Sequence, residues 1–533
     1  MISNFVKYVL DRGGRLNSLE LPYEASEGLG LCNPSLFVTK DGRILCNVRR
    51  VNYLFHLNNR GVWNSCFGPS SYHHPDNDVT LTTHNFMCEL DEYLNVKPET
   101  VKKVDYSKFD TKPRWDFIGE EDVRIVDWDG HVYLTGCRRD TDEKGTSRME
   151  LSEINKDFVE IGRTRVPAPG KNDTYCEKNW MPVLDEPYTY VKWCNPLEIV
   201  KYDTERKVTE SIVTKNYKVE SRDPLADLRG SSQVLTTNDG WHIAMVHEVN
   251  LWVNRYNEKN ANYYTRFIVW DKDWNLLKLS DRFWFLGYQV EFGVGMIERE
   301  EDFVVSFAIY DNAPYTLSIP KKVLFGYIGL EGFPEVHKVL ERTPTRNIYE
   351  RYAANDTDYH LMYEIGLDYY RRKQYGCAYP YFMMCAEKTA DNKTRYRDLS
   401  YNAFYMCMKC HEMLGNRVEK LVKMYGQLID WDSNRYQAYY ELSKLHYGMG
   451  QNKNDHNIAF MFASLAKSKL DNIVQVEGME EPDDDIVEDV MFQYYICGYR
   501  CSKDYMAVEG LRDLLKNGSV RIQNIIKNLG LNL

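Results

Sequence analysis

Short runs of alternating hydrophobic and polar residues dominate the chain from about residue 33 to about residue 340. These runs are rich in Val, Ile, Tyr, Trp and Phe, and alternation with a period of two predicts β-strands. Glycine follows Asp41, Asp129 and Asp239 between such runs, and an Asp-Gly pair favours a tight hairpin because both central residues take positive φ. Recurring hairpins without a long amphipathic helix between them predict a β-propeller or a β-sandwich.

The hydrophobic pattern becomes helical beyond Arg346. Bulky aromatic and aliphatic residues recur there at helical spacing, in segments 359–388, 399–428, 436–469 and 490–515. The segments form helix pairs about 35 to 55 residues apart, which resembles a degenerate tetratricopeptide array. Arrays of this kind present a surface to other proteins, so we expect this region to dock a protein partner. We interpret the acidic run from Glu480 to Asp485 as a solvated loop.

The composition is that of a soluble globular protein, with 43% hydrophobic and 27% charged residues in a chain of 533. Neither a secretory signal near the start nor a stretch of ~20 apolar residues that could span a bilayer is apparent. The 13 cysteines follow no framework spacing, so we expect reduced thiols and a cytoplasmic location. The net charge of -11 argues against broad binding to nucleic acid, although it leaves a local basic groove open.

Six short polar motifs interrupt the β-rich region. Each places charged or hydrogen-bonding side chains at or beside a predicted strand, as expected if the inner strands of successive blades line one funnel. This recurrence favours a propeller over a sandwich. In chain order the motifs are Glu121-Asp122-Val123-Arg124, Glu177-Lys178-Asn179-Trp180, Arg229-Gly230-Ser231-Ser232, His247-Glu248, Glu291-Phe292-Gly293 and Tyr310-Asp311.

Three of these motifs suit sugar or phosphate chemistry, and each also has an ordinary structural interpretation. Asp122 lies between Glu121 and Arg124, and a guanidinium nearby normally lowers the pKa of a carboxyl group; the alternative is a surface ion pair. Arg229 combines a planar cation with an adjacent glycine and two hydroxyls, which suits phosphate or sugar oxygens; the alternative is a plain loop. His247 ends an apolar run, a position that is also typical of a structural histidine.

In this order the motifs resemble those of the five-bladed propellers of glycoside hydrolase family 130 and of the related β-1,2-mannosyltransferases and mannoside phosphorylases. The resemblance covers roughly residues 33–323. In that family a Glu-Asp-Pro-Arg motif carries the catalytic aspartate, and Glu121 to Arg124 resembles it with Val123 in place of the proline. Further matches are Asn33-Pro34-Ser35, Arg49-Arg50-Val51-Asn52-Tyr53, the strand from Gly240 to His247, Glu291-Phe292-Gly293 and Tyr310-Asp311.

The resemblance implies a five-bladed β-propeller, which we place over residues 1–345, and the helical pattern predicts an all-α tetratricopeptide-like domain over residues 346–533. It implies an inverting mechanism in which Asp122 is the single catalytic acid or base and acts through a sugar hydroxyl. Arg49 and Asp311 are then expected to hold the sugar, and Arg124 to orient Asp122. The full set of expected substrate-binding residues is Asn33, Arg49, Asn52, Tyr53, Glu121, Arg124, Lys178, Asn179, Arg229, His247, Glu291 and Asp311.

The chain departs from the resemblance at the phosphate site. Phosphorylases that resemble it place an arginine or histidine pair in the strand after the lysine motif, whereas residues 191–196 read Val-Lys-Trp-Cys-Asn-Pro. Lys178 and Arg229 remain as cations, which suits a sugar phosphate or a nucleotide diphosphate. This departure favours glycosyl transfer over phosphorolysis. Proteins that similarly join a propeller to helical repeats include glycosyltransferases of large viruses and phages.

We therefore predict an inverting glycosyltransferase that takes a sugar from a sugar nucleotide or sugar 1-phosphate and requires no metal or cofactor. A β-mannoside phosphorylase or hydrolase is one alternative, and a non-catalytic glycan-binding scaffold is another. The donor sugar stays open. The acceptor hydroxyl also stays open, because a protein glycan, a polysaccharide and a hydroxymethylated nucleobase all fit the motifs.

Overall fold

The computed structural model describes the 533-residue chain except residues 58–69, 74–79, 171–173, 175, 218–227, 238–239, 254–258, 331–346, 416–417, 451–452 and 503–504. The chain divides into two compact units. Among the described residues, the first unit ends at Tyr381 and the second begins at Phe382. The predicted boundary between residues 345 and 346 falls outside the described residues and stays a prediction.

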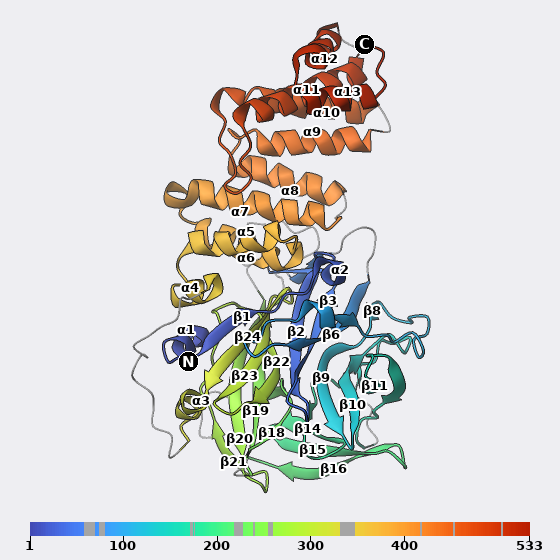
Figure 1. Ribbon diagram of the computed structural model, residues 1–533, viewed down its shortest axis with the longest axis vertical. Coiled ribbons are helices and arrows are strands. Elements are labelled where there is room, and N and C mark those ends of the chain that lie inside the picture. Colours follow the sequence, from blue (N-terminus) through green and yellow to red (C-terminus); the bar gives the residue numbers. More distant parts are fainter. Residues whose placement is uncertain are drawn as a thin grey trace. The chain divides into compact units, whose positions relative to one another are not determined.

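Five antiparallel sheets follow one another through the first unit and form the blades of a β-propeller (Figure 1), which confirms the predicted fold class. Blade one comprises β2 (Gly30–Val38), β3 (Ile44–Val51), β6 (Leu81–Leu90), β7 (Lys102–Lys103) and the parallel β8 (Phe117–Ile118). Blade two comprises β9 (Glu121–Trp128), β10 (His131–Arg138), β11 (Arg148–Ile154) and β12 (Glu160–Arg165). Blade three comprises β13 (Met181–Pro182), β14 (Thr189–Cys194), β15 (Leu197–Asp203) and β16 (Val208–Lys215).

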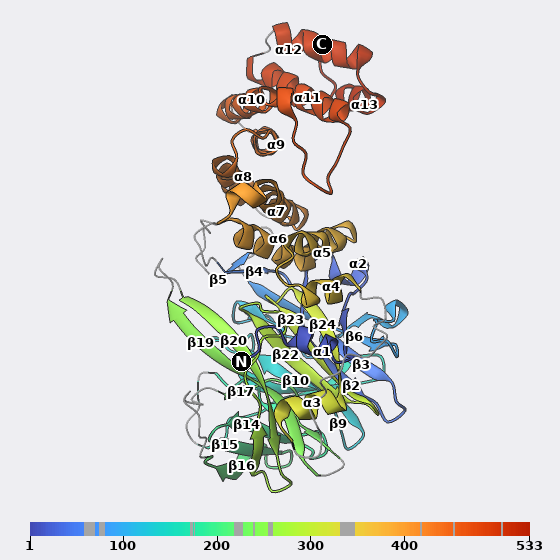
Figure 2. The same ribbon diagram turned by 90° about the vertical axis from the view of Figure 1, so that its left-hand side faces the viewer.

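The remaining two blades complete the ring. Blade four comprises β17 (Leu228–Gly230), β18 (Leu235–Thr236), β19 (His242–Val253), β20 (Lys259–Trp270) and β21 (Leu276–Leu279), and Figure 2 shows β19 and β20 as a long hairpin. Blade five comprises β22 (Glu291–Glu298), β23 (Asp302–Ile309), β24 (Ala313–Pro320) and β1 (Arg15–Ser18). A separate two-stranded sheet pairs β4 (Leu54–Leu57) with β5 (Ser70–His73).

The N-terminal strand β1 closes the propeller. It pairs antiparallel with β24, so that Arg15 lies opposite Ser318 and Ser18 opposite Tyr315. Because the last blade takes a strand from the start of the chain, the two ends of the ring are joined by a sheet ladder. This closure holds the inner strands of the first and last blades at fixed positions around the centre.

Local sequence explains the hairpins that link the strands. Asp129 and Gly130, which join β9 to β10, have φ values of 55° and 84°, as the predicted tight turn requires. Gly42 takes a φ of 83° in the turn between β2 and β3. The predicted turn at Asp239 lies outside the described residues.

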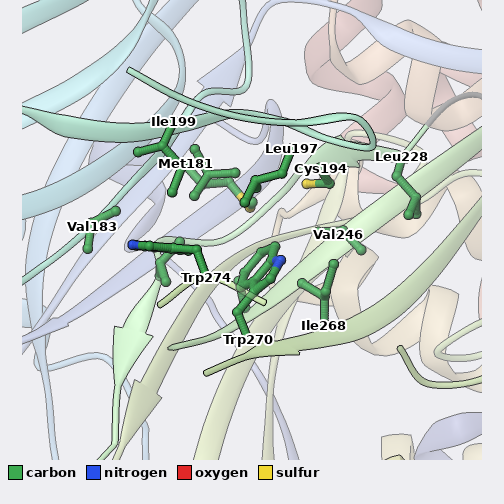
Figure 3. Packing of buried hydrophobic residues seen from close by; sticks show 13 residues of the cluster. Met181, Val183, Cys194, Leu197, Ile199, Leu228, Val246, Ile268, Trp270 and Trp274 are labelled. Carbon is green, nitrogen blue, oxygen red and sulfur yellow. The ribbon is translucent and has the colours of Figure 1, made fainter. Parts of the chain in front are cut away.

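Hydrophobic faces of neighbouring blades pack against each other to form the core. Between blades three and four, Trp270 and Trp274 lie with ring centres 5.6 Å apart, among the aliphatic side chains labelled in Figure 3, such as Met181 and Ile199. Between blades two and three, the buried Trp128 donates an N–H to the carbonyl oxygen of Val183 at 3.0 Å. These contacts combine apolar burial, worth roughly 25 cal/mol per Å², with a fixed alignment of adjacent blades.

Short helices complete the first unit. They are α1 (Phe5–Leu10), α2 (Tyr23–Ser26), α3 (Lys321–Ile328), α4 (Ile348–Ala354) and α5 (Tyr359–Arg371), and α6 (Tyr375–Thr389) spans the boundary between the units. Asn347 and Glu350 form a capping box at the start of α4. The carboxylate of Glu350 also accepts the backbone N–H of Leu16 in β1 at 3.1 Å, which ties α4 to the closing strand.

The second unit is all helical in its described residues, as predicted. Its helices are α7 (Lys393–Met413), α8 (Val418–Trp431), α9 (Gln437–Met449), α10 (Lys453–Lys467), α11 (Asp483–Ser502), α12 (Tyr505–Asn517) and α13 (Val520–Asn528). Ala459 and Ala463 on α10 pack with Ile496 on α11 and with Ile522 and Ile526 on α13. A tetratricopeptide-like repeat stays a prediction.

The acidic run that was predicted to be a loop is partly helical. Asp483, Asp484 and Asp485 occupy the first turn of α11, where the positive end of the helix dipole favours negative charge. Among the described helices of both units, none is both long and apolar enough to cross a membrane.

Candidate active site

A cavity of about 150 Å³ collects polar side chains from all five blades at the inner edge of the propeller. Apolar groups, including Leu81, Phe117 and Val290, line the rest of it. The cavity brings together most of the predicted site residues, namely Asn33, Arg49, Tyr53, Glu121, Asp122, Lys178, Asn179, Arg229, His247 and Asp311. Asn52, Arg124 and Glu291 do not line it.

Left-handed backbone recurs at the cavity wall. Asn33, Asp122, Asn179, Tyr310 and Asp311 have φ values of 44°, 52°, 59°, 48° and 52°, a region that costs non-glycine residues on the order of 1–3 kcal/mol each. Asn and Asp tolerate it best, because their short polar side chains can bond locally. Strained backbone contributed by several blades to one cavity is typical of a functional site.

The strain at Asp122 has a specific consequence. Successive side chains of a regular strand point to opposite faces, yet Glu121 and Asp122 both line the cavity. The ladder between β9 and β10 shifts register beside Gly136, so the inner strand bulges. A Cβ atom at Gly136 would lie 2.6 Å from the carbonyl oxygen of Glu121, so glycine there makes room for the bulge.

One oxygen of Asp122 is held and the other is open. Its Oδ1 accepts hydrogen bonds from Asn33 Nδ2 at 2.6 Å and from Arg49 Nη1 at 2.9 Å. Its Oδ2 has no hydrogen-bond donor among the residues that the structure describes. Burial raises the pKa of Asp122, but Arg49, Arg124 and Lys178 outweigh burial and hold it below the usual value. Asp122 is therefore an ionised carboxylate at neutral pH with one oxygen available to a ligand.

Arg49 connects the two carboxylates of the Glu-Asp motif. Its Nη2 lies 3.8 Å from Glu121 Oε2, while its Nη1 bonds Asp122. Its Nε donates to Thr83 Oγ1 at 3.0 Å, which fixes the plane of the guanidinium. A rigid guanidinium of this kind orients carboxylates more sharply than a lysine could.

Arg124 lies buried behind the cavity wall rather than in it. Its Nε donates to the backbone carbonyl of Ser231 at 2.8 Å, and its Nη1 donates to the backbone carbonyl of Asp122. Both terminal nitrogens lie 3.4 Å from Asn179 Oδ1. Arg124 thus orients Asp122 through its backbone and joins blades two, three and four, so the structure does not support the predicted substrate contact.

Asn52 and Glu291 are also used within the fold. The side chain of Asn52 donates to the carbonyl of Thr80 at 3.0 Å and accepts the N–H of Thr82 at 2.8 Å. The carboxylate of Glu291 accepts backbone N–H groups of the turn before β22, including those of Leu286 at 2.8 Å and Tyr288 at 2.9 Å. Both side chains hold backbone segments in place, and their predicted contacts with substrate stay predictions.

Two cations from other blades also line the cavity, Lys178 and Arg229. Lys178 is partly open to solvent and makes no hydrogen bond or ion pair with the residues that the structure describes. Partial desolvation of its amine acts to lower the pKa of Lys178, but nearby acidic groups, including Cys137, Asp122 and Glu121, raise it above the usual value, so Lys178 stays charged. An anionic ligand is the natural complement to this pair of cations.

His247 is kept neutral by burial and by the nearby cations. Burial first, and then Arg229, Lys178 and Arg124, lower its pKa to about 3. The Nδ1 atom lies 3.0 Å from Ser231 Oγ, and which of the two donates depends on the tautomer. His247 is thus a neutral hydrogen-bonding group beside the cations.

Asp311 differs from Asp122 in the direction of its pKa shift. Burial and the negative charge of Asp122 raise the pKa of Asp311, although Arg49 opposes them. The hydroxyl of Tyr53 donates to Asp311 Oδ2 at 3.2 Å. The cavity therefore holds two carboxyl groups whose environments push their pKa values apart, a pattern typical of sites that separate acid and base roles.

Sequence reasoning missed two aromatic residues of the cavity. Tyr263 stacks on His247 with ring centres 5.9 Å apart, and Phe292 meets the same ring edge-on at 4.8 Å. Phe292 lies in the quoted Glu291-Phe292-Gly293 motif, but we had assigned the ligand contact to the neighbouring glutamate. Tyr263 lies in an aromatic-rich strand, where no local signal separates a site residue from a packing one. Among the described residues, no group of three His, Cys, Asp or Glu side chains could hold a metal ion.

Comparison with known proteins gives similarities at the level of structure. No protein-family model matches the chain, and no curated protein matches it. The chain is similar to MPT-4, a mannose phosphorylase from Leishmania mexicana, at 12% identity and a TM-score of 0.36, over 60% of this chain and 93% of that one. It is similar to β-1,2-mannobiose phosphorylase from Listeria innocua at 11% identity and a TM-score of 0.36, over 57% and 93%.

A third similar structure is MPT-1, a GDP-Man-dependent mannosyltransferase from Leishmania mexicana. The identity is 13% and the TM-score 0.34, over 61% of this chain and 94% of that one. Identities and scores at this level carry no argument about a shared activity.

Proposed function

We propose that the cavity transfers a glycosyl group, with inversion, from a phosphate-linked sugar donor to an acceptor hydroxyl. The observation that carries the proposal is that one cavity holds both an ionised carboxylate with an open oxygen and two cations from other blades. Asp122 is the carboxylate. Lys178 and Arg229 are the cations. A glycosyl phosphate has matching parts, because its sugar is neutral and its leaving group is an anion.

The reaction follows from the carboxylate and the two cations of this cavity. The acceptor oxygen forms a bond to the anomeric carbon while its proton passes to Asp122 Oδ2, directly or through a sugar hydroxyl. The bond between the anomeric carbon and the phosphate oxygen breaks, and its electron pair leaves with the phosphate. Lys178 and Arg229 stabilise the charge that develops there. Asn33 and Arg49 hold the other oxygen of Asp122 in place, so little reorganisation is needed.

The lowered pKa of Asp122 favours transfer from a phosphate donor. Cleavage of an ordinary glycoside needs an acid that protonates the leaving alcohol, and an ionised carboxylate cannot supply that proton. A phosphate leaving group needs no proton, so a base for the acceptor suffices. The raised pKa of Asp311 supports a second candidate, phosphorolysis or hydrolysis of a β-mannoside with Asp311 as the acid.

A ligand screen by thermal unfolding tests the proposal. The ligands are nucleotide sugars, sugar 1-phosphates, nucleoside diphosphates and inorganic phosphate, each with wild type, Lys178→Ala and the control Lys201→Ala, whose residue is exposed on β15. Binding to the folded state stabilises by about 2.7 kcal/mol at a hundredfold excess over Kd. We expect a shift with one phosphate-linked donor that is lost in Lys178→Ala and kept in the control.

Transfer is then measured directly with the donor so found. NMR of the anomeric proton in the product is expected to show inversion. Release of sugar 1-phosphate from an oligosaccharide and inorganic phosphate would instead favour the second candidate. Binding of glycans without any turnover, unchanged in Asp122→Asn, would favour a glycan-binding scaffold and contradict the proposal.

A further inference from the structure

A second cavity of about 200 Å³ adjoins the first in blades three and four. Lys178, Asn179 and Arg229 line both cavities, so these residues form a shared wall. The second cavity adds Lys192 and Trp193 from β14.

Trp193 is much more exposed than Trp180, which lines the same cavity. Its side chain is 41% exposed, whereas Trp180, which lines the same cavity, is 1% exposed. The indole nitrogen of Trp180 donates to Glu177 Oε2 at 3.1 Å, so that ring is part of the core. An exposed indole beside a cavity is a large apolar surface that a flat ligand would cover favourably.

The backbone of β14 presents two neighbouring residues to this cavity. The ladder between β14 and β15 shifts register between Val191 and Trp193, and Lys192 and Trp193 both line the cavity. Lys192 Nζ bonds Glu198 Oε2 at 3.0 Å and lies 6.0 Å from the centre of the Trp193 ring. The aromatic surface is therefore bordered by a cation on its own strand and by two further cations on the shared wall.

We propose that the second cavity binds the nucleoside part of a nucleotide sugar, with the base on Trp193 and the diphosphate on Lys178 and Arg229. The inference rests on the proposed glycosyl transfer and selects a nucleotide sugar over a sugar 1-phosphate as donor. Asp122 and the sugar then lie on one side of the shared cations, and the base lies on the other. Aromatic stacking of a base combined with cations for phosphate is a general mode of nucleotide binding. An acceptor sugar would also stack on an indole, but as a neutral ligand it would leave Lys178 without a charge partner among the described residues.

Calorimetry on the full chain tests this assignment. The probes are ADP, GDP, UDP and CDP, with inorganic pyrophosphate as the matched ligand that lacks a nucleoside. The proteins are wild type, Trp193→Ala, Trp193→Phe and, as an exposed-aromatic control, Tyr505→Ala in α12, where Tyr505 is 71% exposed. We expect one nucleoside diphosphate to bind wild type more tightly than pyrophosphate does. Trp193→Ala should weaken it roughly ten- to a hundredfold, the range that loss of base stacking produces.

The other variants and ligands show whether the loss of affinity is specific to the contact between the base and Trp193. Pyrophosphate should keep its affinity for Trp193→Ala to within about twofold, because the base contact is the one removed. Trp193→Phe should keep most of the affinity for the nucleotide, and Tyr505→Ala all of it. Equal losses for nucleotide and pyrophosphate would overturn the assignment. So would a loss in Trp193→Ala that is confined to oligosaccharide acceptors.

The inference and the proposed function fail in different ways. If pyrophosphate binds wild type but not Lys178→Ala, and every nucleoside diphosphate binds no more tightly than pyrophosphate, the nucleoside subsite is wrong and phosphate-linked transfer stands. If neither pyrophosphate, nucleoside diphosphates nor sugar phosphates bind wild type, both fall together.

Discussion

Glu120 and Asp122 lie two positions apart but belong to two different clusters of charged side chains. Asp122 belongs to the cavity, whereas Glu120 belongs to a largely buried group of charged residues in and beside blade two. This second group, the blade-two cluster, comprises Asp110, Glu120, Arg138, Glu150, Glu160, Arg163 and Arg165.

Most charges of the blade-two cluster form ion pairs with one another. Arg163 Nη2 lies 2.6 Å from Glu160 Oε2 and 2.8 Å from Asp110 Oδ1, and Arg165 Nη1 lies 3.1 Å from Glu150 Oε1. In the cavity, Lys178 makes no such contact with the described residues. Ion pairs of this kind hold a blade together, whereas the charge of Lys178 is available to a ligand.

The two acidic neighbours also differ in protonation. Burial raises the pKa of Glu120 to about 8, because its main cation, Arg138, also serves the neighbouring Glu150. Asp122 is equally enclosed, yet the cations around it hold its pKa below the usual value. The ratio of cations to carboxylates therefore decides protonation here more than burial does.

The largest expected effect is the loss of turnover in Asp122→Asn. The amide keeps an oxygen for Asn33 and Arg49 but cannot accept the proton of the acceptor, so we expect kcat to fall about 10²–10⁴-fold. Donor affinity should change little, whereas the unfolding temperature should fall, because the amide removes the charge that pairs with Arg49. The matched control is Asp110→Asn in the blade-two cluster, which should keep its turnover. If Asp122→Asn retains activity, the open cavity is not where the chemistry occurs.

The next largest effect is on stability, and we expect it in the blade-two cluster rather than in the cavity. Arg163→Ala leaves the fully buried Glu160 without its closest cation, so we expect the free energy of unfolding in urea to fall by about 3–5 kcal/mol. Lys178→Met should change it by less than about 1 kcal/mol, because no described ion pair is lost. The same Lys178→Met protein should lose its affinity for pyrophosphate. Equal destabilisation by the two variants would show that the cavity is as structural as the cluster.

Much of the propeller was predictable because its signals are local. Alternation and Asp-Gly turns specify hairpins such as Asp129-Gly130, and a hairpin needs only neighbouring residues. The polar motifs were predictable for the same reason, since each lies at the start or end of an inner strand. The closure of β1 on β24 was not, because that pairing joins residues some three hundred positions apart and carries no local pattern.

Within the motifs, sequence could identify the cluster but not the direction of each side chain. Glu291 and Phe292 are adjacent, and only the backbone decides that Phe292 faces the cavity while Glu291 holds a turn. At Asp122 the bulge reverses the simple alternation, which no periodicity reveals. Trp193 was noted as a departure from a phosphate clamp, and the second cavity that it lines becomes visible only when β14 and Arg229 are brought together.

A smaller effect is the pH dependence of stability from Glu120. Its folded pKa of about 8 exceeds the ordinary value of 4.5, so its contribution is fully present below pH 4.5 and is lost as the pH rises through 8. Glu120→Gln mimics the protonated form, and Glu120 Oε1 is a buried atom without a hydrogen-bond partner. Relative to wild type, we expect the variant to gain on the order of 3 kcal/mol between pH 5 and pH 8.5, measured by urea unfolding. Asp122 has the opposite sign, because its lowered pKa gives stability that is lost as the pH falls. No relative gain for Glu120→Gln would mean that Glu120 is already ionised in the folded protein.

The smallest expected effect is that His247 adds no pH dependence to anion binding. Sulfate does not titrate between pH 5.5 and 8, so the pH dependence of its affinity reports on the protein alone. With a pKa of about 3, His247 would need an upward shift of more than two units to become charged in this range, which corresponds to about 3 kcal/mol of added interaction with the anion. One sulfate already shared with Lys178 and Arg229 offers less than that to a buried imidazole. The pH dependence of the affinity, measured by calorimetry, should therefore be the same in wild type and in His247→Gln to within about twofold over this range. A tenfold increase in sulfate affinity toward pH 5.5 that is absent in His247→Gln would show that His247 becomes a third cation at the anion site. The repulsion of the imidazolium by Lys178 and Arg229 would then be weaker than their positions indicate.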